Sequence, residues 1–187
     1  MIQNHNTQEQ FKQVMHSCRE LFEKKLHDYG AAWRVMRPST MTDQLYIKAA
    51  RIRSLQTQKE ALVDEGIEAE FVAIVNYSIV AIIQTLKGAA TAEDVTPEEA
   101  LALYDEQAES ALQLMLRKNH DYGEAWRAMR VSSFADLILM KIFRTKQIEE
   151  LEGNTLVSEG PVANYQDMLN YAVFALIKLT LEQKETA

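Results

Sequence analysis

The residues best suited to chemistry lie in a block of thirteen residues that occurs twice in the sequence. The first copy covers residues 25–37 and the second covers residues 118–130, so the copies are 93 positions apart. Ten of the thirteen positions are identical, in the pattern Lys-x-His-Asp-Tyr-Gly-x-Ala-Trp-Arg-x-Met-Arg. Apolar core positions tolerate exchange of one hydrophobic residue for another, so packing alone does not account for this degree of identity. We therefore expect the repeated polar residues to share either a structural bond or a functional site.

The aspartates of the block, Asp28 and Asp121, each precede a Tyr-Gly pair that is typical of the end of a helix. A carboxylate at this end opposes the helix dipole by about 0.3–1 kcal/mol, so it needs a compensating partner. The partner could be an arginine of the block, the backbone of a turn, or a bound ligand or metal ion. In the last case Lys118 and Tyr122 would contact the ligand. The candidate arginines are Arg34, Arg37, Arg127 and Arg130.

A second set of polar residues lies near the end of the chain. Glu159, Asp167 and Asn170 have the spacing i, i+8, i+11, which places them near one face of a helix. Acids in an apolar helix are costly to bury unless they are paired or bind a metal ion. The alternative is an acid that complements the helix dipole, with the asparagine making a contact between helices. The equivalent residues of the first copy are Glu65, Ala73 and Asn76.

Oxygen ligands of this kind suit Mg²⁺, which is usually held by one or two carboxylates together with substrate phosphates. We predict Asp121, Glu159 and Asp167 as the ligands, with Asp28 and Glu65 as weaker counterparts in the first repeat. The histidines that precede both aspartates would build a transition-metal site only if the two copies met. Adjacent helical side chains point about 100° apart, which disfavours that arrangement.

Cations and amide groups recur at matched positions as well. Each repeat has a Lys-x-x-Arg pair that could clamp phosphates, or could be solvated or paired with acids. Each repeat also has an Asn-Tyr pair, which we expect to contact a base or a sugar. The residues are Lys48, Arg51, Asn76 and Tyr77 in the first repeat and Lys141, Arg144, Asn170 and Tyr171 in the second.

The elements that carry these residues are predicted to be helices only. Gly (6) and Pro (3) are scarce, and no segment alternates with the period of a strand. We expect repeat one at 7–88, a linker at 89–95 and repeat two at 96–184. Each repeat should contain three main helices and one short helical piece. About 80–90 residues is close to the smallest size for an independent core, so the repeats should share one core as a pseudo-two-fold bundle.

Helix starts are predicted from capping residues. Thr7 is the expected N-cap of the first helix, and Thr40 with Asp43 resembles another capped start. Thr96-Pro97 is the strongest start signal, because a capping threonine precedes a proline at the first helical position.

Composition narrows the class of protein. A net charge of −7 argues against an extended nucleic-acid surface, because such binding depends on Lys and Arg neutralising phosphates. A single cysteine, Cys18, and an N-terminus without an apolar signal core favour the cytoplasm. The apolar runs at 71–86 and 171–181 are interrupted by polar residues, so no membrane partner is expected. The composition is also compatible with a homodimer.

The order of these motifs resembles a small helical family, the nucleotide-modification-associated domain one, long regarded as a domain of unknown function. The matching stretches are 118–123, 141–144, Glu159 and 167–171, and the order recurs in the first repeat. The family usually has a further acid before the Asp-x-x-Asn-Tyr motif, where this chain has Ala163 or Ala69. The resemblance implies a link to nucleotide modification.

A second likeness is to the all-helical nucleoside triphosphate pyrophosphohydrolases, which place acids on helices around Mg²⁺; it is an analogy of fold. We therefore expect a nucleotide-binding protein, with Mg²⁺-dependent nucleotide hydrolysis as its candidate activity. The alternative is a non-catalytic helical binding or scaffold module.

Overall fold

The computed structural model describes residues 6–57 and 66–182, which contain six α-helices and no strand. Each repeat has three α-helices with a short 3-10 helix after the first, as the sequence predicts. Repeat one contains α1 (Thr7–Tyr29), η1 (Ala32–Val35), α2 (Pro38–Thr57) and α3 (Ile67–Lys87). Repeat two contains α4 (Pro97–Tyr122), η2 (Ala125–Ala128), α5 (Val131–Glu150) and α6 (Pro161–Leu176), which continues into the π-helical turn η3 (Ile177–Glu182).

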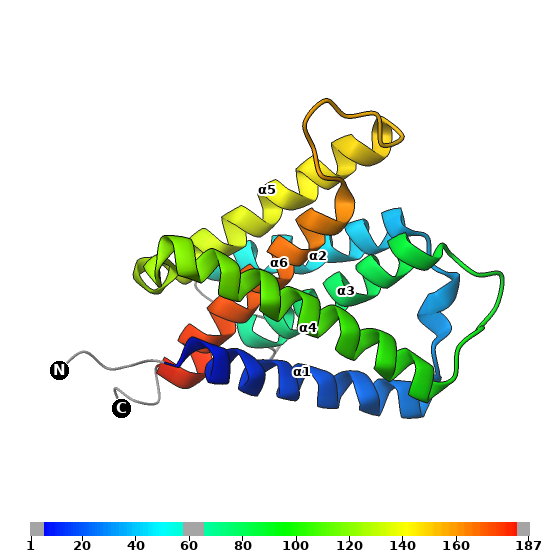
Figure 1. Cartoon of the computed structure of the whole chain (residues 1–187), viewed down its shortest axis with the longest axis horizontal. Coiled ribbons are helices and arrows are strands. Elements are labelled where there is room, and N and C mark those ends of the chain that lie inside the picture. The colour runs from blue at the N-terminus through cyan, green and yellow to red at the C-terminus, as the bar shows by residue number, and fades with distance from the viewer. Residues whose placement is uncertain (1–5, 58–65, 183–187) are drawn as a thin grey trace.

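The two repeats are related by a pseudo-two-fold axis. Each helix packs against its own counterpart: α3 against α6, α2 against α5, and α1 against α4. Self-matched contacts of this kind are what a two-fold axis requires. Figure 1 shows α1 and α4 side by side along one edge of the bundle, and the end of α5 projecting from it with the loop that leads to α6.

The buried apolar residues form one cluster, to which all six α-helices contribute. The tandem duplication therefore folds as a pseudo-two-fold helical bundle. The central helix α3 is long and apolar enough to cross a membrane, by length and composition alone, which the sequence reading did not expect. Its most apolar stretch is 67% buried inside the protein, so this is the weak signal that a core helix also gives.

Two predicted helix starts were wrong by one or two residues. Asn6, rather than Thr7, is the N-cap of α1, because its side chain accepts a hydrogen bond of 3.2 Å from the Glu9 amide. Helix α2 begins at Pro38 rather than at Thr40, since proline suits the first turn, where no backbone N–H is needed. The Thr96 start is confirmed as a capping box.

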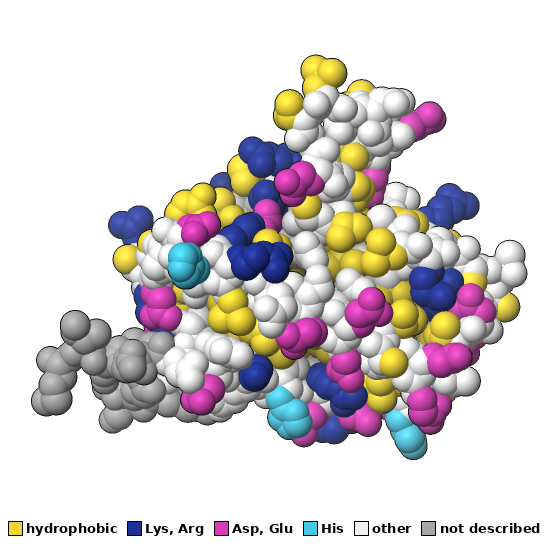
Figure 2. All heavy atoms as spheres, in the orientation of Figure 1, with side chains coloured by type: hydrophobic (Ala, Val, Ile, Leu, Met, Phe, Trp, Pro, Cys, Tyr) yellow, Lys and Arg dark blue, Asp and Glu magenta, His cyan; other side chains and the backbone are white. Residues whose placement is uncertain are grey.

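Glycines end the first helix of each repeat where the repeated block predicts. Gly30 has φ = 62° and Gly123 has φ = 63°, a conformation that costs side chains other than glycine strain energy. The chain then enters η1 or η2, which places the tryptophan of the block against the core. Figure 2 shows acidic and basic side chains intermixed over one face of the molecule.

Candidate functional site

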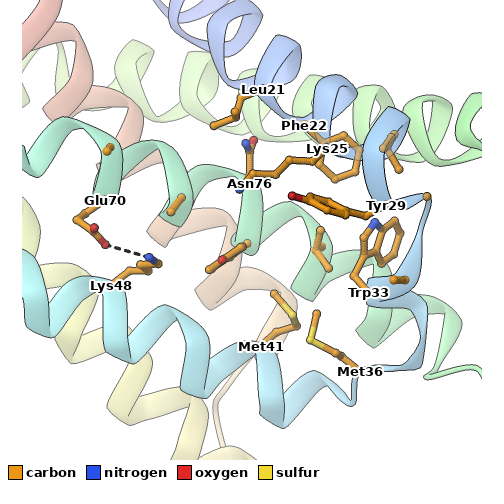
Figure 3. Close-up of a pocket in the computed structure, with 17 residues that line it drawn as sticks. Leu21, Phe22, Lys25, Tyr29, Trp33, Met36, Met41, Lys48, Glu70 and Asn76 are labelled. Carbon is orange, nitrogen blue, oxygen red and sulfur yellow. Dashed lines mark ion pairs between the residues drawn. The ribbon is translucent and has the colours of Figure 1, made fainter. Parts of the chain in front are cut away.

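Both repeats contain a pocket built from equivalent residues. In repeat one it has a volume of about 680 Å³, and in repeat two about 400 Å³. The walls come from the end of the first helix, the 3-10 turn and the last helix of each repeat. The second helix adds one lysine in both repeats, and also Met41 in repeat one. The shared polar and aromatic positions are Lys25/Lys118, Tyr29/Tyr122, Trp33/Trp126, Lys48/Lys141, Asn76/Asn170 and Tyr77/Tyr171. Figure 3 shows the repeat-one pocket, which we call pocket A; its counterpart in repeat two is pocket B.

Asp167 occupies the centre of the charged groups in repeat two. Its carboxylate lies 2.6 Å from Lys118 Nζ and 2.7 Å from Lys141 Nζ, and 14% of the side chain is exposed. Lys141 and Asp167 also line a third pocket of about 840 Å³, pocket C, with Arg144, Glu159 and Asn164. Pockets B and C are thus joined at one ion pair, and together they contain most of the residues predicted for repeat two.

Repeat one has its buried acid, Glu70, on α3, one helical turn before the position that corresponds to Asp167. Ala73 replaces Asp167, and Glu70 stands where repeat two has Asn164. Glu70 is 2% exposed and pairs with Lys48 at 3.4 Å and with Arg51. The Lys-x-x-Arg pair of repeat one is therefore neutralised by an acid, as one of its two readings predicted. Arg144 is exposed and has no carboxylate partner among the described residues.

The two repeated asparagines fasten the last helix of each repeat to the first. Asn76 Nδ2 donates to the Cys18 carbonyl at 3.1 Å, and Asn170 Nδ2 donates to the Ala111 carbonyl at 3.3 Å. Asn76 Oδ1 also accepts a hydrogen bond of 2.8 Å from Tyr104. Asn170 Oδ1 is buried and has no donor in the described part of the chain.

This difference between the amides follows from the sequence. The offset of 93 places Phe11 where repeat two has Tyr104, and α1 packs on α6 as α4 packs on α3. Phenylalanine has no hydroxyl to donate. The carbonyl of Asn170 is therefore left without the donor that Tyr104 gives to Asn76.

The tryptophans of the block contribute to the pockets in a way that the sequence reading missed. Trp126 is 6% exposed and stacked on Phe174, with 4.3 Å between ring centroids. The indole Nε1 atoms of both tryptophans are buried, and neither has an acceptor in the described residues. The available signal was that both tryptophans of the chain fall in the repeated block.

Tyr171 lies over pocket B with its phenol protonated at neutral pH. Burial raises its pKa, and the Asp167 carboxylate adds to this effect, while Lys118 and Arg144 oppose it. The hydroxyl can therefore act as a donor as well as an acceptor. Tyr29 and Tyr122 differ from it, because they are 70% and 77% exposed at the pocket rims and are not core residues.

The aspartates of the block line neither of the equivalent pockets. The carboxylates of Asp28 and Asp121 lie 3.1 Å from the Nδ1 atoms of the preceding His27 and His120, and all four side chains are exposed. The salt bridges to arginines of the block are not formed. Arg34 is buried and pairs with Asp94 at 2.7 Å, and the equivalent Arg127 pairs with Glu124 at 2.6 Å and with Glu182.

The predicted magnesium ligands are not gathered at one point. Asp121 lines neither pocket B nor pocket C, whereas Glu159 and Asp167 both line pocket C. Asp28 is exposed in the same way, and Glu65 lies outside the described residues. Within 6–57 and 66–182, no three His, Cys, Asp or Glu side chains are arranged to hold a metal ion. Two carboxylates remain, a number that Mg²⁺ accepts when phosphates complete its shell.

The fold and the pockets together are those of a helical bundle made by tandem duplication, with an equivalent pocket in each repeat. A family model, nucleotide modification associated domain 1, matches the chain twice, at residues 25–85 and 118–179. The chain belongs to this family, as its motifs indicated. No curated protein and no solved structure matches it.

Proposed function

We propose that repeat two binds a nucleotide across the joined pockets B and C. One observation carries the proposal: Lys141 and Asp167 line both pockets, so a chamber lined by aromatic and amide groups adjoins one with cations. The volumes of about 400 and 840 Å³ lie within the usual range for ligand sites, roughly 300–1,000 Å³.

The base and sugar would lie in pocket B. Trp126 and Asn170 line this pocket, and the indole N–H of the one and Oδ1 of the other are buried without partners in the described chain, so a ligand would have to uncover them to pair with them. Unsatisfied buried polar groups cost roughly 1–3 kcal/mol each, so a ligand that pairs with both would gain affinity and selectivity. Tyr122 at the rim and Tyr171 beside it could cover a flat ring.

The phosphates would lie in pocket C, against Arg144 and Lys141. Among the described residues Arg144 has no carboxylate partner to displace, and its planar guanidinium can bind two phosphate oxygens at once. Lys141 now pairs with Asp167, and a phosphate would share or replace that partner. The family's name, which mentions nucleotide modification, supports the same class of ligand.

The test is thermal unfolding with a panel of nucleotides, with and without Mg²⁺. A ligand at 100 times its Kd adds about 2.7 kcal/mol, or roughly 5–10 °C for a chain of this size. Arg144→Ala should abolish the shift. Arg51→Ala, at the position of Arg144 in repeat one, is the matched control and should leave the shift intact. If no nucleotide raises the midpoint, the polar network is structural and the scaffold alternative holds.

Hydrolysis dependent on Mg²⁺ is the second candidate, favoured by Glu159 and Asp167 lining one pocket. Bound there, the ion would neutralise phosphate charge and supply an activated water. A phosphate-release assay distinguishes this activity from simple binding. Glu159→Gln should then stop release while nucleotide binding without Mg²⁺ persists. Release that is unaffected by Glu159→Gln would contradict this assignment.

A further inference from the structure

Pocket A in repeat one differs in chemistry from its counterpart in repeat two. It is the larger of the equivalent pair, at about 680 Å³ against about 400 Å³. Figure 3 shows its apolar side chains around one end and the Lys48–Glu70 ion pair at the other. The apolar residues on which the argument depends are Phe22, Trp33, Met36 and Met41.

Because the acid of repeat one is Glu70 rather than a residue at position 73, Lys25 is left available at pocket A. In repeat two Lys118 pairs with Asp167 at 2.6 Å. In repeat one the equivalent Lys25 lines the pocket, and Ala73 stands in the place of that acid. Glu70 is taken by Lys48 and Arg51. Lys25 therefore has no carboxylate partner in the described part of the chain, and it extends from α1 beside the pocket in Figure 3.

A second polar group belongs to the lining of pocket A. Trp33 Nε1 is buried and has no acceptor in the described residues, and Phe22 packs against the ring with 6.3 Å between centroids. A buried N–H without an acceptor carries a desolvation penalty that a ligand oxygen would remove. The lining of pocket A thus combines apolar walls, a tryptophan whose buried N–H has no acceptor in the described residues, and a cation.

We infer that pocket A is a second ligand site, specific for a compact aromatic molecule that bears one anionic group. The ring lies between the apolar walls, an oxygen on or near the ring accepts from Trp33, and the anionic group lies on Lys25. This site does not depend on nucleotide binding in repeat two, because no residue lines both pocket A and pocket B or C.

The chain provides its own reporters for the test, because it has two tryptophans, one at pocket A and one at pocket B. Each indole N–H gives one signal in a ¹⁵N–¹H correlation spectrum, and Trp33→Phe and Trp126→Phe assign the pair. The probe is 1-naphthyl phosphate, compared with neutral 1-naphthol. We expect 1-naphthyl phosphate to shift the Trp33 signal saturably, with a Kd roughly tenfold below that of 1-naphthol, because one nearby cation contributes on this scale.

Two variants test the role of charge. Ala73→Asp recreates the acid that Asp167 provides in repeat two, where the fold accommodates it. This variant should weaken the binding of 1-naphthyl phosphate roughly tenfold and leave the affinity for 1-naphthol unchanged. Lys25→Ala should have the same selective effect with no new group in the pocket. An unchanged thermal midpoint in both variants confirms that the fold is intact.

Three results would overturn the inference. They are a Trp33 signal that does not move, equal affinity for both probes, and a shift confined to Trp126, which would place the probe in repeat two. The first two results leave nucleotide binding untouched, because that is read from thermal shifts that depend on Arg144. The third would support an aryl phosphate site in repeat two while removing the one in repeat one.

Discussion

Replacing Tyr104 with phenylalanine should weaken the contact that joins the two repeats at Asn76. The Tyr104 hydroxyl donates to Asn76 Oδ1 at 2.8 Å, and the two residues are 1% and 6% exposed. Burial raises the pKa of Tyr104, so the phenol stays protonated as the donor. Phenylalanine keeps the ring, which packs on Phe22 with 4.7 Å between centroids, and removes only the hydroxyl.

The expected cost follows from what the substitution leaves behind. Asn76 Oδ1 becomes a buried acceptor without a donor, and such an atom costs about 1–3 kcal/mol. In a thermal scan of a chain of this size, each kcal/mol of lost stability would lower the melting temperature by roughly 2–4 °C. The assay is urea unfolding at pH 7 followed by circular dichroism, with the free energy extrapolated to water and the slope compared with that of the wild type.

The reciprocal variant is the matched control. Phe11→Tyr places a hydroxyl at the position of Tyr104 in the other repeat, where Asn170 Oδ1 has no donor in the described chain. It should stabilise the fold by about 0.5–1.5 kcal/mol. A loss below about 0.3 kcal/mol for Tyr104→Phe, together with no gain for Phe11→Tyr, would refute the hydrogen-bond account of why Asn recurs.

Two further predictions concern the turn after α1 and the linker beside it. Gly123→Ala should cost about 1 kcal/mol from its positive φ alone, because nothing lies within 4 Å of the added carbon. Gly30→Ala should cost about 2–3 kcal/mol, because the added carbon meets the Glu93 carboxylate, which accepts from the Ala31 amide at 2.6 Å. Equal losses in urea unfolding would contradict the role given to Glu93. The hydrogen bond from Arg34 lowers the pKa of Asp94 below its ordinary 3.8, so the pair stabilises the fold above that pH and loses its effect as the pH falls through the lowered value. Asp94→Asn should therefore be less stable than the wild type at neutral pH and should approach it below pH 3.8, as measured by unfolding across pH.

The repeated aspartates show where sequence reasoning stops. Identity between the repeats indicated that Asp28 and Asp121 matter, but not which way their side chains point. At the last turn of a helix, the backbone of the following glycine turns the chain toward the core. Tyrosine and tryptophan of the block therefore line the pocket, while the aspartate beside the exposed histidine faces water. Periodicity along one helix does not contain this information.

The duplication is visible when the sequence is compared with itself. The all-helical class, the capped start at Thr96 and the glycine-ended helices are predictable because each depends on residues close together in the chain. Which of the repeated polar groups meet depends instead on how the helices pack. Asp167 lies between two lysines of other helices, and Glu70 takes its place one turn earlier in repeat one. Tyr104 satisfies an amide that Phe11 leaves open on the other side of the axis. Such pairings depend on how α3 and α6 pack against their neighbours, which is a property of the assembled bundle rather than of any segment.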